Sequence, residues 1–554
     1  MSLSVRATSN PFPQLPGYIL SEVLHQGTRT VVYRAVQTAQ QRPVIIKVLR
    51  HEHLNSSELV RYRHQYVMAK RLTNLKIVHP LSWEPLGRSY ALVMADEGTL
   101  SLEAYAQQRS LPWPEVLQIA LQLTDILYGL SQHRVIHKDI KPAHLLIHPA
   151  SKAIQLIDFS LASQLPRETQ ELQNPHALEG TLAYMAPEQT GRMNRSIDYR
   201  ADYYALGCTL YQLLTGHLPF EADDPWELVH CHLAKVATPI HKINLTVPQQ
   251  LSAIVAKLMA KTAEARYQSA LGLKYDLEQC RTQWEGTGTV STFDLGQQDD
   301  CDCFIIPEKL YGRETAVEAL RKAGDRILSQ PAKAAAPQSE LMLIAGASGS
   351  GKTTVVNELH KPITRHRGYF ITGKFDQFDG NIPFSAFTQA LQNGMEQLLS
   401  ESAVKRAKWR TDMLAAVGDE GQVLIELVPA LEPLIGPQPP TVELSGAAAQ
   451  QRLEQLFQAL FAVLATAAHP LVIFLDDLQW ADAASLQLIK SLINRNRHLL
   501  LIGAYRDHEV SSTHPLAIMV EELQKTSSTV NTLTLAPLSL NDTHQLIADT
   551  LRWS

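Results

Sequence analysis

The chain has few cysteines and no long hydrophobic run, and both features exclude classes of protein. It contains five cysteines among 554 residues, an odd number that does not suit the disulfide framework of a small secreted protein. No apolar stretch approaches the ~20 residues that a membrane-spanning helix needs. The first residues also lack the apolar segment of a secretory signal. We therefore expect a cytoplasmic protein without a membrane segment.

Charged residues are also scarce, at 19%, and the formal net charge is −5. Neither value indicates the excess of positive charge that binds polyanions, so we expect no nucleic-acid partner. Apolar residues make up 45% of the chain, which is typical of a folded globular protein. Because 554 residues are too many for a single hydrophobic core, we expect several domains.

The most informative stretch is residues 135–147, VIHKDIKPAHLLI, in which two short apolar runs flank Asp139 and Lys141. Asp158 follows the next apolar run. Two aspartates on loops beside strands suit phosphoryl transfer, because one can accept the proton of the acceptor hydroxyl while the other holds a divalent metal against the phosphates. The alternative is a pair of acidic turns between buried strands.

This stretch resembles the catalytic and metal-binding loops of eukaryotic-type serine/threonine protein kinases. The resemblance implies that Asp139 is the catalytic base, that Lys141 steadies the transferred phosphate and that Asp158 is a metal ligand. His144 stands where the family carries a metal-binding Asn, and imidazole is a poor replacement for an amide oxygen on Mg²⁺. Three interpretations stay open: an active kinase with one weakened metal site, a kinase that prefers Mn²⁺, and a pseudokinase that binds nucleotide without transfer.

After an N-terminal tail over residues 1–16, we expect the small lobe of the kinase domain over residues 17–95. The resemblance makes Lys47, which lies inside an apolar run, the ligand of the α- and β-phosphates. Gly27 is the one glycine left in the loop that covers the phosphates. Gln65 replaces the Glu that pairs with the strand lysine, so we expect that lysine to be held less firmly.

The large lobe is expected over residues 96–285. The resemblance places the adenine at the hinge between the lobes, beside Met94 and Glu97. Residues 180–188 match the end of an activation segment, in which Thr181 helps to position the hydroxyl of a Ser/Thr acceptor. Three further residues match structural positions of the family. The resemblance implies that Asp202 braces the catalytic loop and that Arg266 pairs with Glu188.

Residues 286–304 are polar, acidic and contain glycine, so we expect a linker there and a second domain over residues 305–554. Its main motif, GASGSGKT at residues 346–353, fits the P-loop pattern between an apolar strand and a helix. Backbone amides of such a loop bind phosphates, while its Lys reaches the β/γ-phosphates and its Thr binds Mg²⁺. The expected nucleotide ligands are Gly346, Gly349, Gly351, Lys352, Thr353 and Thr354.

The apolar strand over residues 471–475 ends on Asp476, expected to complete the Mg²⁺ site, and on Asp477, expected to orient water. With Arg506 as a sensor of the nucleotide, these motifs resemble STAND-type AAA-like ATPases. The alternative for Arg506 is a surface residue after a strand. The domain order resembles the N-terminal part of bacterial multi-domain sensor kinases, and the resemblance implies that the ATPase domain is truncated before its helical lid.

The sequence therefore predicts a multidomain protein with an α+β bilobal protein-kinase fold, followed by an α/β P-loop NTPase with a parallel sheet. We expect a kinase that transfers the γ-phosphate of ATP to Ser or Thr of a protein, weakened by His144 and Gln65 and coupled to a signalling ATPase. ATP with Mg²⁺ or Mn²⁺ are the expected cofactors, signalling proteins are the expected partners, and oligomers stay open. The alternative function is a nucleotide-sensing scaffold that binds ATP and transfers little phosphate.

Overall fold

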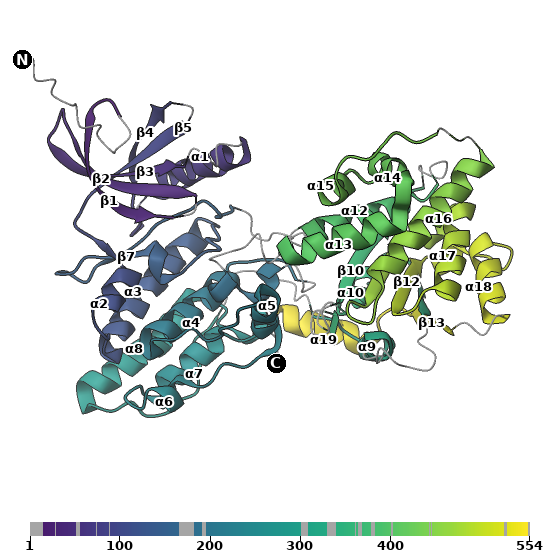
Figure 1. The fold of residues 1–554 in the computed structure, drawn as a ribbon. Helices are drawn as coiled ribbons and strands as arrows, with labels where there is room; N and C mark the ends of the chain where they lie inside the picture. The colour runs from purple at the N-terminus through teal and green to yellow at the C-terminus, as the bar shows by residue number, and fades with distance from the viewer. Residues whose placement is uncertain are drawn as a thin grey trace, which may run out of the picture.

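The computed structural model shows two bodies, one in purple and teal for the first half of the chain and one in green and yellow for the second (Figure 1). It describes residues 15–551 except for internal stretches at 28, 51–55, 74, 88, 165–181, 191–194, 301–308, 329–338, 360–361, 364–367, 378–382, 400, 402, 443, 445 and 526–528.

The small lobe is a five-stranded antiparallel sheet in the order β1-β2-β3-β5-β4, with the helix α1 beside it. The elements are β1 (Tyr18–Gln26), β2 (Thr30–Gln37), β3 (Arg42–Leu49), α1 (Ser56–Arg71), β4 (Pro80–Leu86) and β5 (Ser89–Ala95). Val44, Ile46 and Val48 alternate along β3 and are buried in one core cluster. Because side chains alternate between the faces of a strand, Lys47 points to the opposite face, toward α1.

The large lobe is mainly helical and has a small three-stranded sheet in the order β6-β7-β8. Its elements are β6 (Leu100–Ser101), α2 (Leu102–Gln108), α3 (Trp113–Gln132), β7 (Leu145–Ile147), β8 (Ile154–Leu156), α4 (Arg200–Thr215), α5 (Pro225–Ala234), α6 (Ile240–Ile243), α7 (Gln249–Leu258) and α8 (Ala270–Thr287). The apolar faces of α3, α4, α7 and α8 form one core, which supports the loops around β7 and β8.

The stretch predicted as a linker, residues 286–304, begins inside α8. From residue 289 to residue 300, where the structure describes it, the chain lies against the large lobe instead of standing apart. Val290, Phe293 and Leu295 pack on the large-lobe core. These three apolar side chains explain the packing, although the stretch as a whole is polar. The exact limits of the domains stay predictions.

The second body contains a five-stranded parallel sheet in the order β10-β11-β12-β9-β13. Its strands are β9 (Glu340–Gly346), β10 (Tyr369–Lys374), β11 (Leu471–Asp476), β12 (Leu499–Tyr505) and β13 (Thr529–Leu535). The strands β9, β11 and β12 are buried almost throughout, as expected for parallel strands covered on both faces. This arrangement confirms the predicted α/β fold with a parallel sheet.

Two apolar cores flank this sheet, one on each face. The smaller core is formed with α9 (Glu314–Leu328) and α10 (Lys352–Asn357). Most other helices contribute to the larger core: α12 (Ser385–Leu399), α13 (Ala403–Val417), α14 (Gly421–Leu427), α15 (Glu432–Ile435), α16 (Ala447–Leu464), α17 (Ala483–Arg495) and α18 (Pro515–Lys525). Parallel strands of this kind bind ligands beyond their carboxyl ends.

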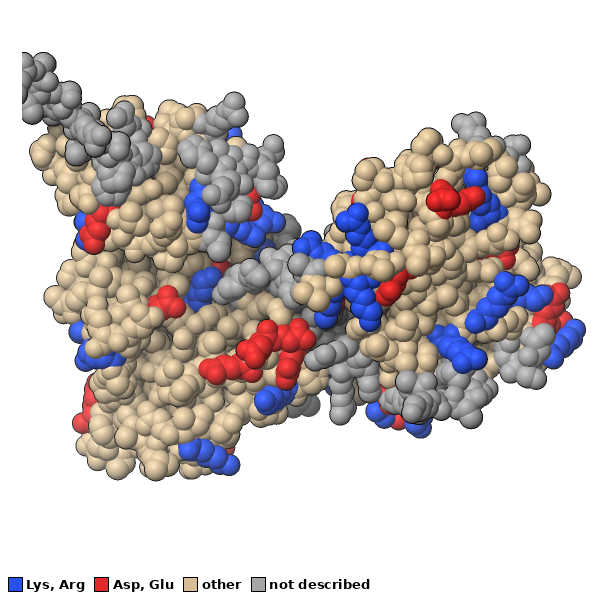
Figure 2. Space-filling model, in the orientation of Figure 1, with Lys and Arg blue, Asp and Glu red and all other residues tan. Residues whose placement is uncertain are grey.

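The described chain ends with α19 (Leu540–Leu551), which lies against the segment that enters the second body. The hydroxyl of Tyr311 donates a hydrogen bond of 2.8 Å to Asp549. Within the residues that the structure describes, no helix has the length and hydrophobicity to cross a membrane. Figure 2 shows the charged side chains of the visible face in small groups between wide uncharged areas, in keeping with their low content.

Candidate functional sites

The loop before β7 is held in place by a side chain of α4. The backbone amides of His137 and Lys138 each donate a hydrogen bond of 2.8 Å to the carboxylate of Asp202. Lys138 adopts a φ of 67°, which lets the two amides point at the same side chain. Burial raises the pKa of Asp202 to about 7, against the opposing effect of these two donors. Asp202 thus braces this loop, as the sequence predicted.

The imidazole of His137 connects the same loop to the chain that leads to Asp158. Burial lowers the pKa of His137 to about 4, so the ring is neutral at pH 7 and donates from one nitrogen only. Its Nε2 lies 3.1 Å from the carbonyl oxygen of Ile157, and its Nδ1 lies 3.3 Å from the amide nitrogen of Asp139. The ring therefore donates to Ile157 and accepts from Asp139, which fixes the two loops relative to each other.

Within the part of the chain that the structure describes, one carboxylate oxygen of Asp139 is hydrogen-bonded and the other is not. Lys141 Nζ lies 3.0 Å from Asp139 Oδ2. Asp139 Oδ1 is buried and has no hydrogen-bond partner among the described residues. Since a buried carboxylate oxygen normally has a donor, Oδ1 retains the capacity to accept a hydrogen bond, for example from a hydroxyl.

The side chain of Lys47 extends from β3 of the small lobe and contacts both α1 and Asp158. Its ammonium donates to Gln65 Oε1 at 3.1 Å and to Asp158 Oδ2 at 2.8 Å. The glutamine therefore occupies the position that the sequence predicted for a partner of Lys47. Glu58, the nearest acidic alternative in α1, instead lies 3.6 Å from Arg29.

His144 lies between the two aspartates. Its Nδ1 is 3.0 Å from the backbone oxygen of Asp139 and 3.2 Å from Asp139 Oδ2, and its Nε2 is 3.6 Å from Asp158 Oδ2. Burial lowers the pKa of His144 although both carboxylates oppose that shift, so the ring is neutral at pH 7. Burial alone would raise the pKa of Asp158, but the Lys47 ammonium holds it well below its usual range. An ionised carboxylate and a neutral imidazole form a donor set that fits a divalent metal accepting nitrogen.

The remaining residues predicted for the kinase nucleotide site lie around the hinge and the first strand. Met94 is on β5, and Glu97 follows that strand with its carboxylate 3.0 Å from the side-chain nitrogen of Gln155. Gly27 follows β1, and its amide donates to the backbone oxygen of Thr30 at 2.9 Å. Thr181 lies outside the described residues.

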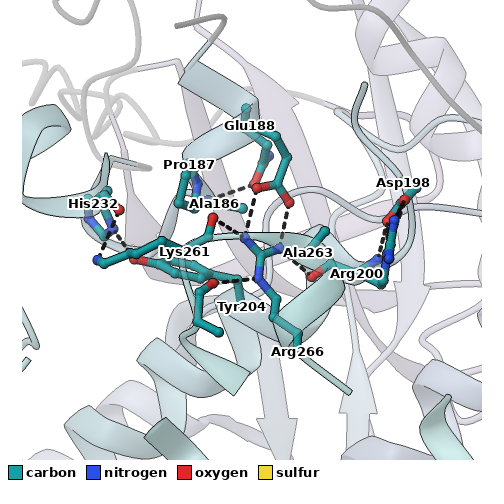
Figure 3. Close-up of polar contacts among 12 residues, drawn as sticks. Ala186, Pro187, Glu188, Asp198, Arg200, Tyr204, His232, Lys261, Ala263 and Arg266 are labelled. Atoms are coloured by element: carbon teal, nitrogen blue, oxygen red, sulfur yellow. Dashed lines mark hydrogen bonds and ion pairs between the residues drawn. The ribbon is translucent and has the colours of Figure 1, made fainter. Parts of the chain in front are cut away.

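Behind the end of the activation segment, Glu188 and Arg266 form a buried ion pair (Figure 3). Arg266 Nη1 and Nη2 donate to the two carboxylate oxygens at 2.6 and 2.8 Å. The guanidinium also donates to the backbone oxygens of Ala260 and Arg200, at 2.8 and 2.9 Å. The predicted structural pair is therefore present, and the guanidinium of Arg266 also lies over the Tyr204 ring, 4.9 Å from its centroid.

The P-loop follows β9 and leads into α10. Gly349 and Gly351 have φ of 75° and 89°, a conformation that glycine adopts without strain. Lys352 Nζ donates to the backbone oxygens of Gly346 and Ala347, each at 2.9 Å. Its ammonium thus lies over the loop whose amides are expected to bind phosphate. Thr354 also lies on α10.

At the carboxyl end of β11, the hydroxyl of Thr353 donates to Asp476 Oδ2 at 3.0 Å. The structure therefore brings together the hydroxyl and the carboxylate that the sequence predicted as Mg²⁺ ligands. Two oxygens, one from the start of α10 and one from the end of β11, suit this hard cation, which is usually held by few protein ligands together with phosphate oxygens.

Asp477, in a left-handed conformation with φ of 54°, is surrounded by donors. Gln479 Nε2 donates to Asp477 Oδ1 at 2.8 Å, Lys374 Nζ lies 3.4 Å from Oδ2, and Arg506 Nε lies 3.6 Å from Oδ1. The guanidinium of Arg506 also stacks over the Trp480 ring, 4.9 Å from its centroid. Arg506 is thus within reach of the predicted site.

Two residues of this region were missed by sequence reasoning. Gln479 binds Asp477 and also accepts a hydrogen bond of 3.1 Å from the backbone amide of Arg506. Arg313 is buried, and its Nη2 donates to the backbone oxygen of Ser350 in the P-loop at 3.1 Å. The position of Gln479 three residues after the strand-terminal Asp476 was the available signal. For Arg313 the signal was its place in the Leu-Tyr-Gly-Arg-Glu stretch at the entrance to the domain.

Comparison with known families agrees with the two predicted folds. Residues 18–277 match the protein kinase domain family, and residues 309–502 match the AAA ATPase domain family. The chain is similar to hybrid signal transduction histidine kinase G of Dictyostelium discoideum, with 34% identity over 336 residues, which are 57% of this chain and 10% of that protein.

Two bacterial kinases are also similar to it. A probable serine/threonine-protein kinase of Clostridium perfringens is 27% identical over 300 residues, which are 54% of this chain and 43% of that protein. Serine/threonine-protein kinase PknB of Mycobacterium leprae is 30% identical over 266 residues, which are 47% of this chain and 42% of that protein. The chain thus spans less than half the length of these three curated relatives.

Proposed function

We propose that this chain, a serine/threonine protein kinase domain followed by an AAA ATPase domain, transfers the γ-phosphate of ATP to serine or threonine side chains of a protein. The observation that carries the proposal is the arrangement around Asp139. One of its oxygens is paired with Lys141, and the other is buried without a partner among the described residues. An acceptor hydroxyl donating to that oxygen would complete its hydrogen bonding.

In the proposed reaction, Asp139 accepts the proton of the acceptor hydroxyl while the new oxygen–phosphorus bond forms and the bond to ADP breaks. Lys47 binds the α- and β-phosphates, and Lys141 stabilises the negative charge of the transferred group. Asp158 and His144 would hold a divalent metal, which, when bound, neutralises charge on the phosphates. Thr181 is proposed to position the acceptor.

The test is transfer of labelled γ-phosphate from ATP by the full chain to a serine- and threonine-rich protein acceptor, with Mg²⁺ and Mn²⁺ supplied separately. Label on acceptor serine or threonine with either metal is the expected result. ATP binding without labelled acceptor under both conditions would contradict the proposal and favour a nucleotide-sensing scaffold. Because only label on protein is counted, ATP hydrolysis by the second domain does not contribute to the signal.

We propose Mn²⁺ as the better metal for this kinase, because a neutral imidazole replaces an amide oxygen at His144. His144→Asn is expected to raise the ratio of Mg²⁺-supported to Mn²⁺-supported transfer about tenfold, which corresponds to ~1.4 kcal/mol in the barrier. The rates of transfer with each metal provide the measurement. His133→Asn, a change at an exposed histidine of the same lobe, is the control. An unchanged ratio in His144→Asn would exclude this histidine as a metal ligand.

The AAA ATPase domain is proposed to bind a second nucleotide through the P-loop, with Thr353 and Asp476 holding Mg²⁺. Asp477 would orient water, and Arg506 would respond to the state of the nucleotide. We propose that the whole chain phosphorylates proteins and that nucleotide binding at the P-loop regulates this activity. Signalling proteins are the proposed partners.

Lys352→Ala is expected to weaken nucleotide binding at this second site about 10–100-fold, because a charged hydrogen-bond donor to the phosphates is lost. Titration of the full chain with a nonhydrolysable ATP analogue should then show about one tight site in place of about two. Lys525→Ala, at an exposed lysine of α18, is the control. Two tight sites in Lys352→Ala would show that this loop is not the nucleotide site.

A further inference from the structure

Residues 289–300, here named the return segment, are built into the large lobe by specific contacts. Beyond Gly288, the residue that caps α8, Gln250 Nε2 donates to the backbone oxygen of Phe293 at 2.7 Å. The amide of Gly296 donates to Asp276 Oδ2 at 2.9 Å. Because backbone atoms are bound along its length, the segment has a defined path over the lobe.

Asp299 makes three further attachments to the lobe. Its Oδ2 accepts a hydrogen bond of 2.8 Å from the amide of Gln268, and its Oδ1 accepts from the amide and the hydroxyl of Ser269, at 2.8 and 3.0 Å. A Cβ added to Gly272 would lie 2.5 Å from the Cα of Asp299. Glycine at this position of α8 thus permits a close approach that a larger residue would prevent.

Gln268, whose amide binds Asp299, is connected by hydrogen bonds to the end of the activation segment. Gln268 accepts from the Tyr199 hydroxyl at 2.7 Å through its backbone oxygen and from Arg200 Nη1 at 2.8 Å through its side chain. The backbone oxygen of Arg200 accepts from Arg266 Nη1, which also binds Glu188 (Figure 3). A continuous series of hydrogen bonds therefore leads from the return segment to Glu188.

We propose that Asp299 is a positioning residue for the kinase reaction. It holds the turn before α8, and through Arg266 it holds Glu188 and the adjoining acceptor-binding part of the activation segment. The return segment is also the chain that continues toward the AAA ATPase domain, so it is the covalent route by which that domain acts on the acceptor site. This inference rests on the proposed kinase function.

The first test compares Asp299→Asn with Asp300→Asn in the full chain. An Asn amide offers one acceptor oxygen in place of two, and its NH₂ group would face a backbone N–H. Asp299→Asn is expected to raise the KM for the protein acceptor about fivefold while the KM for ATP stays within about twofold. Asp300 is exposed, and its variant should leave both values unchanged. Equal acceptor KM values in the two variants would overturn the proposal.

A second test displaces the return segment by a change in α8, against which Asp299 lies. Ala normally stabilises a helix relative to Gly, so Gly286→Ala, at an open position of α8, should keep or raise Tm. Gly272→Ala should instead lower Tm by several degrees and raise the acceptor KM as Asp299→Asn does, because its Cβ meets Asp299. If Gly272→Ala raised Tm as the control does and left the acceptor KM unchanged, Asp299 would not occupy this position.

Failure of the kinase function can be told apart from failure of this inference. If the parent chain labels no acceptor, the proposed function fails, and amide hydrogen exchange then tests the positioning role alone. Asp299→Asn is expected to speed exchange at residues 183–190, whereas Asp300→Asn is not. Unchanged exchange in that stretch would overturn the inference whatever the activity.

Discussion

Replacing Asp139 by Asn is expected to lower phosphoryl transfer about 10²–10⁴-fold, the contribution of a positioned general base. The amide retains the size of the carboxylate but cannot take the proton of the acceptor hydroxyl. Its effect on ATP binding should be small, because the phosphates are expected to bind through Lys47 and the metal. Labelled transfer and nucleotide binding, each measured on the same preparation, provide the two readouts.

The matched control for this prediction is Asp125→Asn, which removes an exposed carboxylate of α3 that pairs with Lys274. It should transfer phosphate at the parent rate. Transfer by Asp139→Asn at a rate near that of the control would show that another group takes the proton. Loss of ATP binding together with transfer would instead assign Asp139 a role in nucleotide binding.

The residues around this base could be predicted from sequence because each lies beside a short apolar run. Asp139, Lys141 and Asp158 follow or precede strands that pair locally, so their spacing along the chain determines how close they come. Lys47 is more distant in sequence, but its place within an apolar strand shows that its side chain leaves a buried sheet. Family resemblance then supplied the roles, which remain proposals.

The parts that could not be predicted depend on contacts between segments far apart in the chain or on side-chain orientation. Spacing gives no indication that Asp139 Oδ1 lacks a partner or that both nitrogens of His144 face carboxylates. The return segment was predicted as a linker from its polar composition. Composition does not show that Asp299 would accept three hydrogen bonds from the two residues before α8.

Gln65 illustrates a site in which sequence and structure must be combined. The sequence identified a neutral residue where the family has Glu, and the structure places its amide oxygen 3.1 Å from Lys47. In the described part of the chain, the carboxylate within ion-pair distance of Lys47 is that of Asp158. Asp158 is also the proposed metal ligand. Its one carboxylate must therefore serve both the Lys47 ammonium and the metal. This competition is a physical reason to expect weakened transfer.

Glu188→Gln is expected to destabilise the protein by about 3–5 kcal/mol, because it leaves the charge of Arg266 buried without its counter-charge. The side chain of Arg266 has 0% exposure and that of Glu188 has 4%. Glutamine preserves the shape of the site, so packing alone should change little. Urea unfolding of the full chain, followed by a signal from the kinase domain, measures the change. Glu318→Gln, at an exposed ion pair on α9, is the control and should leave the transition unchanged.

The same pair allows the cost of burying a charge to be separated from the value of the ion pair. Removing one partner leaves a buried charge without a counter-charge. Replacing both partners by apolar residues of similar volume leaves no buried charge at all. The double variant Glu188→Met with Arg266→Met should therefore be more stable than Glu188→Gln alone. Its acceptor KM should nevertheless rise, because the hydrogen bond from Arg266 to the backbone oxygen of Arg200 is lost. A double variant less stable than Glu188→Gln would show that the guanidinium contributes mainly through its bonds to backbone oxygens.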